Sequence, residues 1–177
     1  YLGTFDCYTF FSLNHIPDMS NSKTLESSVL IRFPDCDPFN HLNNARYLDY
    51  FINAREDHLW ENYQFNVYHY AKEHGKSWVV GANQIVYLKP AMLMETVVIQ
   101  STLRKLREKE ILVEMMMWNK DKIQLKAVLW STFVHFNMQT QRSEVHSKEL
   151  TDYFSAFEEP FETAITFEER IAQLKAK

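Results

Sequence analysis

Residues 32–51 read RFPDCDPFNHLNNARYLDYF, a polar segment placed between two apolar patterns. Upstream, residues 27–33 (SSVLIRF) alternate apolar and polar side chains, which predicts a strand with Val29, Ile31 and Phe33 on one face. The polar part then brings two carboxylates, one imidazole and an Asn pair into ten residues. An ordinary turn needs fewer functional groups, so this segment is the first candidate for a site.

Downstream, residues 44–62 have the 3.6-residue periodicity of a long amphipathic helix. Asn43 or Asn44 is expected to cap it, because a side-chain amide oxygen can accept a hydrogen bond from a first-turn N–H. The predicted apolar side of the helix consists of Tyr47, Leu48, Phe51, Ile52, Leu59 and Trp60.

The rest of the chain predicts an antiparallel sheet followed by helices. A loop is expected at residues 64–77, and the charged stretch RKLREKE (residues 104–110) is expected to form a hairpin tip. Strands are predicted at residues 78–88, 94–106, 111–118 and 123–136, and helices at 148–157 and 166–175. Thr166 and Glu169 form a capping-box pattern. One long helix and a large antiparallel sheet indicate an α+β fold with the sheet wrapped over the helix.

Composition sets limits on the function. The 177 residues are 46% hydrophobic and suit one globular domain, while the net charge of −4 argues against a general nucleic-acid binder. Two cysteines, Cys7 and Cys36, suit neither a disulfide framework nor a zinc cluster, which favours the cytoplasm. No segment reaches the roughly 18 apolar residues of a membrane span. The three glycines cannot build a Walker loop or a GxGxxG fingerprint.

The first 18 residues are expected to be an extension of the domain. They are rich in aromatic residues but lack the basic and long apolar regions of a signal peptide. Met19 opens a polar stretch that is typical of an ordinary start. We therefore expect residues 19–177 to form the functional domain.

The order of these features resembles the hotdog-fold acyl-CoA thioesterases of the 4-hydroxybenzoyl-CoA thioesterase type. That family has an apolar strand ending in Arg-Phe or Tyr-Phe, an Asp-x-Asp, three spacer residues, and then often His-x-Asn-Asn at the start of a helix, as residues 32–51 do here. Residues 85–99 (IVYLKPAMLMETVVI) also resemble its second and third strands. Asn40 and Met94 stand where the family often has Gly; Asn tolerates the left-handed backbone conformation better than most residues.

The polar segment suits the chemistry of thioester hydrolysis. Negative charge develops on the carbonyl oxygen, where a helix N-terminus supplies unpaired N–H groups and a positive dipole end. A carboxylate can activate water as a general base or attack directly as a nucleophile. The resemblance implies that Asp37 is this carboxylate, and that the His41 imidazole and a neighbouring backbone N–H hold the carbonyl. It also implies that Asn43 and Asn44 are the helix-capping pair, and it implies no cofactor.

Other interpretations of the same residues stay open. Asp37-Pro38 is also an ordinary turn initiator, and Asp35, Asp37 and His41 would make a weak metal site within one turn. Cys36 lies between two carboxylates, which disfavour a thiolate. The alternative function is a non-catalytic module that binds acyl-CoA or acyl-carrier protein. An (R)-specific enoyl-CoA hydratase is disfavoured, because its motif has a different spacing.

The resemblance also implies how substrate and subunits bind. Its 4-hydroxybenzoyl-CoA members contact the CoA nucleotide through basic residues of a hairpin that matches Arg107 and Lys109 here, although a solvated hairpin tip explains these charges as well. Apolar residues on both faces of the later strands predict a partner chain, because one helix can cover only one face. A homodimer or homotetramer with acyl-CoA as substrate is expected.

Overall fold

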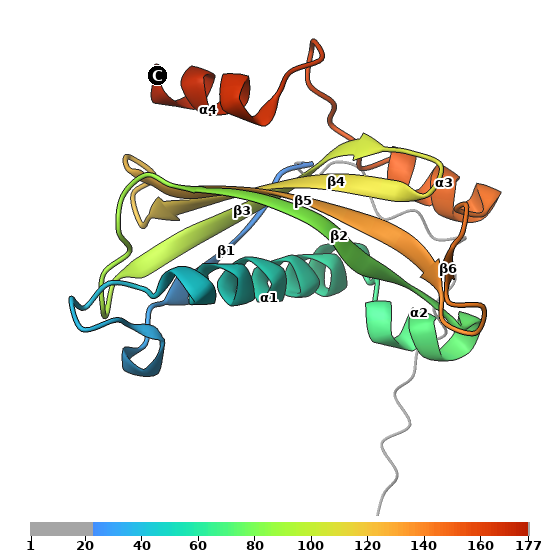
Figure 1. Cartoon of the computed structure of the whole chain (residues 1–177), viewed down its shortest axis with the longest axis horizontal. Coiled ribbons are helices and arrows are strands. Elements are labelled where there is room, and N and C mark those ends of the chain that lie inside the picture. The colour runs from blue at the N-terminus through green and yellow to red at the C-terminus, as the bar shows by residue number, and fades with distance from the viewer. Residues whose placement is uncertain (1–22, 177) are drawn as a thin grey trace, which may run out of the picture.

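The computed structural model describes residues 23–176 as a curved antiparallel sheet with a long helix along its inner face (Figure 1). The expected extension at residues 1–18 lies outside the described residues. The strands are β1 Leu25–Leu30, β2 Lys76–Tyr87, β3 Thr96–Leu106, β4 Glu110–Asn119, β5 Leu125–Asn137 and β6 Arg142–Ser143. The helices are α1 Asn44–Tyr63, α2 Val67–His74, α3 Lys148–Ser155 and α4 Phe167–Lys175, with a 3-10 turn at Phe33–Asp35.

The strand order β1-β3-β4-β5-β2 confirms the expected single α+β hotdog domain. β6 is a short addition that pairs with the end of β5. β1 pairs with β3 and β2 with β5, so β1 and the 12-residue β2 form the two edges of the sheet. α1 lies along the inner face, and its apolar side chains join the main core with residues of β3, β4 and β5.

Local chemistry explains where α1 begins and ends. The Asn43 side chain accepts a hydrogen bond from the N–H of Ala45, and Gln64 ends the helix in a left-handed conformation at φ 54°. The predicted apolar side is correct for Tyr47 and Phe51 but wrong for Trp60, which is 50% exposed. Two polar residues, Arg55 and His58, take the buried positions instead. The apolar pattern of α1 therefore did not reveal which polar side chains are buried.

The expected loop at residues 64–77 contains a helix, and the prediction there was wrong. α2 is capped by Asn66, whose side chain accepts from the N–H of His69, and it ends at Gly75 with φ 65°. Eight residues are short for a periodicity to emerge. The cap residues were visible in the sequence as signals for the two ends of a helix.

The end of the first strand and the extent of the hairpin tip also differ from the prediction. β1 ends at Leu30, and Phe33 lies in the 3-10 turn with 75% of its surface exposed, because the proline at position 34 starts that turn. At the other end of the sheet, most of residues 104–110 continue β3 and β4. The hairpin tip is therefore confined to residues 107–109.

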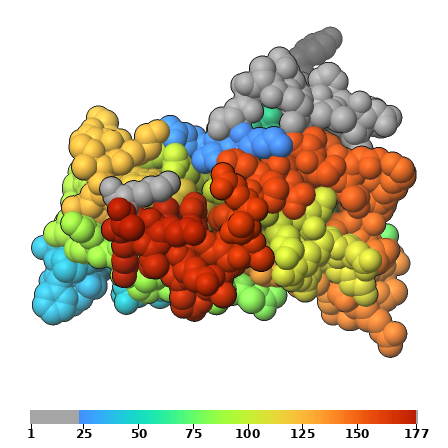
Figure 2. Space-filling model, turned by 90° about the horizontal axis from the view of Figure 1, so that it is seen from above, coloured from blue at the N-terminus to red at the C-terminus, as the bar shows by residue number. Residues whose placement is uncertain are grey.

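α4 covers part of the outer face of the sheet, on the opposite side from α1 (Figures 1 and 2). Its residues Phe167 and Ile171 form a second apolar cluster with Met116, Val128 and Trp130 of β4 and β5. The capping box of Thr166 and Glu169 is confirmed at its N-terminus. The expectation that this face is bare in a monomer was therefore wrong over the area that α4 covers.

A buried carboxylate fastens α4 to the sheet. Glu114 of β4 accepts hydrogen bonds from Arg104 at 2.9 Å, from Arg170 of α4 at 2.8 Å and from the Trp130 indole at 2.9 Å. Its side chain is fully buried. Burial opposes the charge of Glu114, but the hydrogen bonds from Arg170 and Trp130 and the charges of both guanidinium groups lower its pKa below the ordinary value. Both guanidinium groups also pack over the ring of Phe161, with their Cζ atoms 4.9 and 5.3 Å from its centre.

Within residues 23–176, no helix combines the length and the apolar character that crossing a membrane requires. The cytoplasmic location that the cysteine usage favours stays a prediction.

Candidate active site

Two loops meet at the N-terminal end of α1: residues 31–43, which follow β1, and residues 88–95, which precede β3. Backbone hydrogen bonds of 2.8–3.0 Å join them at Ile31–Glu95, Met94–Ile31, Leu42–Ala91 and Leu93–Asn40. The buried Lys126 of β5 braces the second loop, with its Nζ 2.7 Å from the Glu95 carboxylate and 2.9 Å from the Pro90 carbonyl. The sheet thus determines the shape of the polar segment through the second loop.

Asn40 and Met94 adopt the left-handed backbone conformation, with φ 61° and 63°. For Asn40 this confirms that the turn survives without Gly. Met94 has a side chain that disfavours the same conformation, and it is 64% exposed. Its N–H nevertheless donates to Ile31 at 3.0 Å, so the contact between the two loops maintains the turn.

Asp37 is held by one of its two carboxylate oxygens. Oδ1 accepts from the N–H of Phe39 at 2.9 Å and of His41 at 3.0 Å, and the Asp37 N–H donates to the His41 carbonyl at 2.8 Å. Oδ2 has no hydrogen-bond partner among the described residues. The turn role of Asp37 is therefore real, and the carboxylate still presents one oxygen that can act on another molecule.

His41 lies beside Asp37, but its backbone N–H is already engaged. Because that N–H donates to Asp37 Oδ1, it does not point at a substrate carbonyl in this arrangement. The half-buried imidazole lies 6.3 Å from the ring of Phe39, measured between ring centres. The side chain of Phe39 is 76% exposed, so this face of the loop is both apolar and accessible.

The start of α1 adds an unpaired backbone donor. Asn43 is the N-cap, and its side chain satisfies the N–H of Ala45 at 3.0 Å. Asn44 is the first helical residue, and its N–H has no partner within the described part of the chain. The Asn44 carbonyl accepts from the Tyr87 hydroxyl at 3.1 Å, which ties the helix start to the end of β2. A helix N-terminus with one open N–H suits a negative oxygen.

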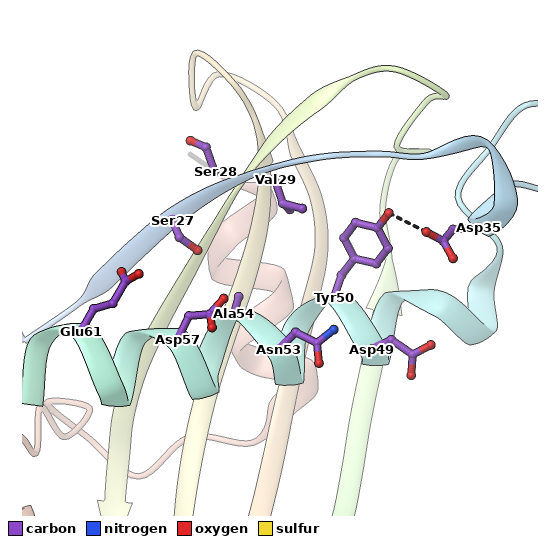
Figure 3. Close-up of a pocket in the computed structure, with 10 residues that line it drawn as sticks. All are labelled: Ser27, Ser28, Val29, Asp35, Asp49, Tyr50, Asn53, Ala54, Asp57 and Glu61. Atoms are coloured by element: carbon purple, nitrogen blue, oxygen red, sulfur yellow. Dashed lines mark hydrogen bonds between the residues drawn. The ribbon is translucent and has the colours of Figure 1, made fainter. Parts of the chain in front are cut away.

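The Asp35 side chain contacts residues of α1, unlike the side chain of Asp37. Its Oδ2 accepts from the Tyr50 hydroxyl at 2.9 Å (Figure 3). Arg46 lies 3.7 Å from its Oδ1. Burial raises the pKa of Tyr50. The hydrogen bond from the Arg32 backbone lowers it in part, and Asp35 raises it further. Asp35 therefore links the polar segment to α1.

Asp35 also lines a groove of about 640 Å³ between β1 and α1. Figure 3 shows carboxylates along its helix side, and the acidic residues of the lining are Asp35, Asp49, Asp57 and Glu61. Three carboxylates on the helix wall and a fourth, Asp35, from the 3-10 turn disfavour the phosphates of CoA. This groove is therefore a poor candidate for the nucleotide.

Cys36 is a poor nucleophile, as expected. Its Sγ lies 3.4 Å from the Arg32 carbonyl, and burial together with the charges of Asp35 and Asp37 raises the pKa of the thiol. Among residues 23–176, no group of three or more His, Cys, Asp or Glu side chains is arranged to hold a metal ion.

An apolar cavity of about 90 Å³ lies on the other side of α1, toward β4, β5 and β2. Nine of its eleven lining residues are apolar, among them Ile52, Leu59 and Trp78, and one of the two exceptions is Arg55. Arg55 is not among the site residues that the sequence predicts. A usable signal was present, because Arg55 follows Phe51 by four residues and so falls within the buried stripe of the helix.

The structure does not bring Arg107 and Lys109 to the site of their own chain. They lie at the β3–β4 turn, one whole strand from the loop before β3, which is about 30 Å at the usual rise per residue. Arg107 pairs with Glu110 at 2.9 Å on the surface. Within a single chain, Arg107 and Lys109 therefore lie on a solvated hairpin tip.

Comparisons with known proteins agree with this geometry. The thioesterase-like superfamily matches residues 31–165. The long-chain acyl-CoA thioesterase FadM of Escherichia coli K12 is 28% identical over 128 residues, which cover 72% of this chain and 95% of FadM. The crystal structure of YbaW, a probable thioesterase from Escherichia coli, is 28% identical with a TM-score of 0.66 and covers 76% of this chain and 98% of its own. SAV2348 from Staphylococcus aureus, solved in complex with CoA, shares the fold with a TM-score of 0.71 at 12% identity, over 88% and 94% of the chains. Because the family match spans most of the chain, this protein belongs to the thioesterase-like superfamily and is a thioester hydrolase of the hotdog fold.

Proposed function

We propose that the protein hydrolyses acyl-CoA to a free carboxylic acid and CoA, with Asp37 as the reacting carboxylate. The observation that carries this proposal is the half-engaged carboxylate of Asp37, which is anchored through Oδ1 and open at Oδ2. The similarity to FadM, named as a long-chain acyl-CoA thioesterase, supports CoA thioesters as the substrate class.

In the proposed reaction, the substrate carbonyl oxygen accepts a hydrogen bond from the N–H of Asn44 at the start of α1. Asp37 Oδ2 either removes a proton from water as the water adds to the carbonyl carbon, or attacks that carbon and forms an anhydride that water then hydrolyses. In both routes the C–S bond breaks and the CoA sulfur leaves with the electron pair. One proton of the water ends on that sulfur and the other on the carboxylic acid, so Asp37 returns to the carboxylate form. Negative charge on the former carbonyl oxygen is stabilised by the helix N-terminus.

The proposed role of His41 is narrower than the resemblance implied. Because its backbone N–H donates to Asp37, the imidazole is the part of His41 left to contact the substrate. Asn43 acts on the substrate indirectly, since its side chain caps the helix whose first N–H faces the carbonyl. Asn44 contributes its backbone, so we expect Asn44→Ala to retain most of the activity.

The test is thiol release from a panel of acyl-CoA substrates by the wild type, Asp37→Asn and a matched control, Asp35→Asn. Loss of the general base or nucleophile lowers kcat by about 10²–10⁴. Asp35→Asn still accepts the Tyr50 hydrogen bond, so its kcat stays within a few-fold of wild type. Asp37→Asn activity close to wild type rejects the assignment. Acyl-CoA binding without any thiol release by the wild type favours the non-catalytic module instead.

We propose that the active form is a homo-oligomer that pairs through β2. This strand is a 12-residue edge with Val79, Val80 and Tyr87 exposed, and unpaired strand edges favour pairing with another chain. Phe39 and Met92 of the two loops add exposed apolar surface. Light scattering with a dilution series of activity tests this proposal. A monomer with full specific activity rejects it, and Val80→Lys is expected to weaken the assembly.

Arg107 and Lys109 contact CoA in this proposal only at a partner subunit's site. The distance of about 30 Å from their own site, one strand length, favours a contact with CoA bound to the partner subunit. Arg107→Gln and Lys109→Gln are expected to raise KM several-fold for acyl-CoA and to leave KM unchanged for the same acyl group on a short thiol without a nucleotide. Equal effects on both substrates reject the nucleotide contact.

A further inference from the structure

Arg55 is a buried cation without a charged partner. Its side chain is in the middle of α1 and the residue is 6% exposed, yet its one hydrogen-bond partner among the described residues is the neutral Ser101 Oγ, at 3.3 Å. Burial lowers its pKa to about 10, so the guanidinium stays charged at neutral pH. Arginine is rarely buried unless it is paired, because removing the charge from water is unfavourable.

The nitrogens of Arg55 that have no hydrogen-bond partner among the described residues are not completely sealed from solvent. In the part of the chain that the structure describes, Ser131 Oγ and His135 Nε2 are the side-chain polar atoms that are both sealed from solvent and without a partner. The Arg55 guanidinium has other N–H donors besides the one that reaches Ser101. None of its nitrogens is among these sealed, unpartnered atoms. Arg55 is also one of the residues that line the apolar cavity.

This cavity lies along the side of α1 that starts at the candidate site. Leu48, Ile52 and Leu59 follow Asn44 at intervals of 4, 8 and 15 residues, which places them on one side of a helix with 3.6 residues per turn. Arg55 follows Asn44 by 11 residues, about 17 Å along the helix axis. An acyl chain whose carbonyl is at the helix start would have to extend about 17 Å along this apolar side to reach Arg55.

We propose that Arg55 binds a carboxylate at the far end of the acyl chain, so that the preferred substrates are CoA monothioesters of long-chain dicarboxylic acids. This inference rests on the proposed function. A guanidinium is matched in shape and charge by a carboxylate, and a cavity of about 90 Å³ has room for such a group with a few methylenes. The apolar remainder of the lining suits the chain.

Glu56 is the other charged residue of the lining, and it faces a different partner. Its two carboxylate oxygens accept from the Tyr68 hydroxyl of α2 at 2.9 and 3.0 Å. Its negative charge opposes a second carboxylate in the cavity. We therefore expect Glu56→Gln to strengthen the preference for dicarboxylic substrates, whereas neutralising Arg55 abolishes it.

The experiment compares kcat/KM for three substrates of equal length: dodecanoyl-CoA, 12-hydroxydodecanoyl-CoA and the monothioester of dodecanedioic acid. Wild type is expected to favour the dicarboxylic substrate over dodecanoyl-CoA by a factor of about ten to one hundred, which corresponds to hydrogen bonds with a charged group. Arg55→Met loses this ratio, and Arg55→Lys keeps part of it. Arg142→Met, at an exposed arginine of β6, keeps the wild-type ratio.

Several outcomes would overturn the proposal. Equal kcat/KM for the three substrates in wild type, a preference for the hydroxyl alone, or an unchanged ratio in Arg55→Met each reject it. If Arg55→Met does not fold, or if no acyl-CoA is hydrolysed, thermal shifts of the wild type with dodecanedioate and dodecanoate decide. A clearly larger shift with dodecanedioate supports the Arg55 site, and equal shifts reject it, whatever the fate of the proposed reaction.

Discussion

Substituting Glu114 by Gln tests whether the buried cluster under α4 stabilises the fold. The Glu114 side chain is fully buried and meets Arg104 and Arg170, whose side chains are 10% and 14% exposed. Removing one member of a buried ion pair leaves an uncompensated charge and costs about 3–5 kcal/mol. Gln keeps the shape and one acceptor, so we expect a loss near the lower end, about 3 kcal/mol.

For a chain of this size, that loss lowers the melting temperature by roughly 6–12 °C. The matched control is Glu110→Gln, on the same strand, where the carboxylate pairs with Arg107 at the surface and the two side chains are 37% and 55% exposed. Such a pair contributes about 1 kcal/mol or less. Thermal and urea unfolding of both variants measure the difference.

Turnover of Glu114→Gln at 25 °C is expected to match wild type, because α4 lies on the opposite face of the sheet from α1. A double-mutant cycle with Arg170→Met is expected to be strongly non-additive, since the two residues share hydrogen bonds. Melting temperatures of Glu114→Gln and Glu110→Gln within 2 °C of each other would refute the reasoning that α4 is held by this carboxylate.

Three further predictions concern α1 and its loops. Asn43→Ala removes the N-cap and is expected to lower the free energy of unfolding by about 1 kcal/mol, measured by urea titration with Asn44→Ala as the control. Met94→Gly relieves a left-handed backbone that costs about 1–2 kcal/mol, partly offset by the entropy of Gly, so its melting temperature should rise while Met92→Gly lowers it. Burial and the charge of Arg55 lower the pKa of His58 to about 4; below pH 6.5 the unfolded chain binds a proton that the folded chain does not, so stability falls by about 3 kcal/mol as the pH drops to 4. His58→Gln should lack that part of the pH dependence, and parallel curves for wild type and variant would contradict the assignment.

Local signals in the sequence predicted most of the fold. The alternation of β3 to β5, the long helix from Asn44, the capping box of Thr166 and the left-handed Asn40 depend on residues within a few positions of each other. Asp37 and His41 are brought together because four residues separate them in one turn. Such features need no knowledge of distant parts of the chain.

The missed features depend on contacts between distant segments. Arg55 and His58 are buried because Ser101 of β3, and for His58 also Ser27 of β1, supply their polar partners. The docking of α4 on the outer face of the sheet depends on the ion pair of Arg170 with Glu114, which is 56 residues away in the sequence. Because these side chains are polar, the apolar pattern did not single them out, although Arg55 falls within the buried stripe of α1.

The order of strands in the sheet has a consequence for how the chain folds. β3, β4 and β5 follow one another through short turns, whereas β2 is separated from its partner β5 by two intervening strands, and β1 from its partner β3 by α1, α2 and β2. Closing long loops is entropically unfavourable and distant pairings form slowly. We therefore expect the three-stranded meander to nucleate first and both edges to dock later. The Asp37 loop lies between the β1 edge and the segment before β3. A partly folded chain is therefore expected to form its sheet before the Asp37 carboxylate takes its reactive position.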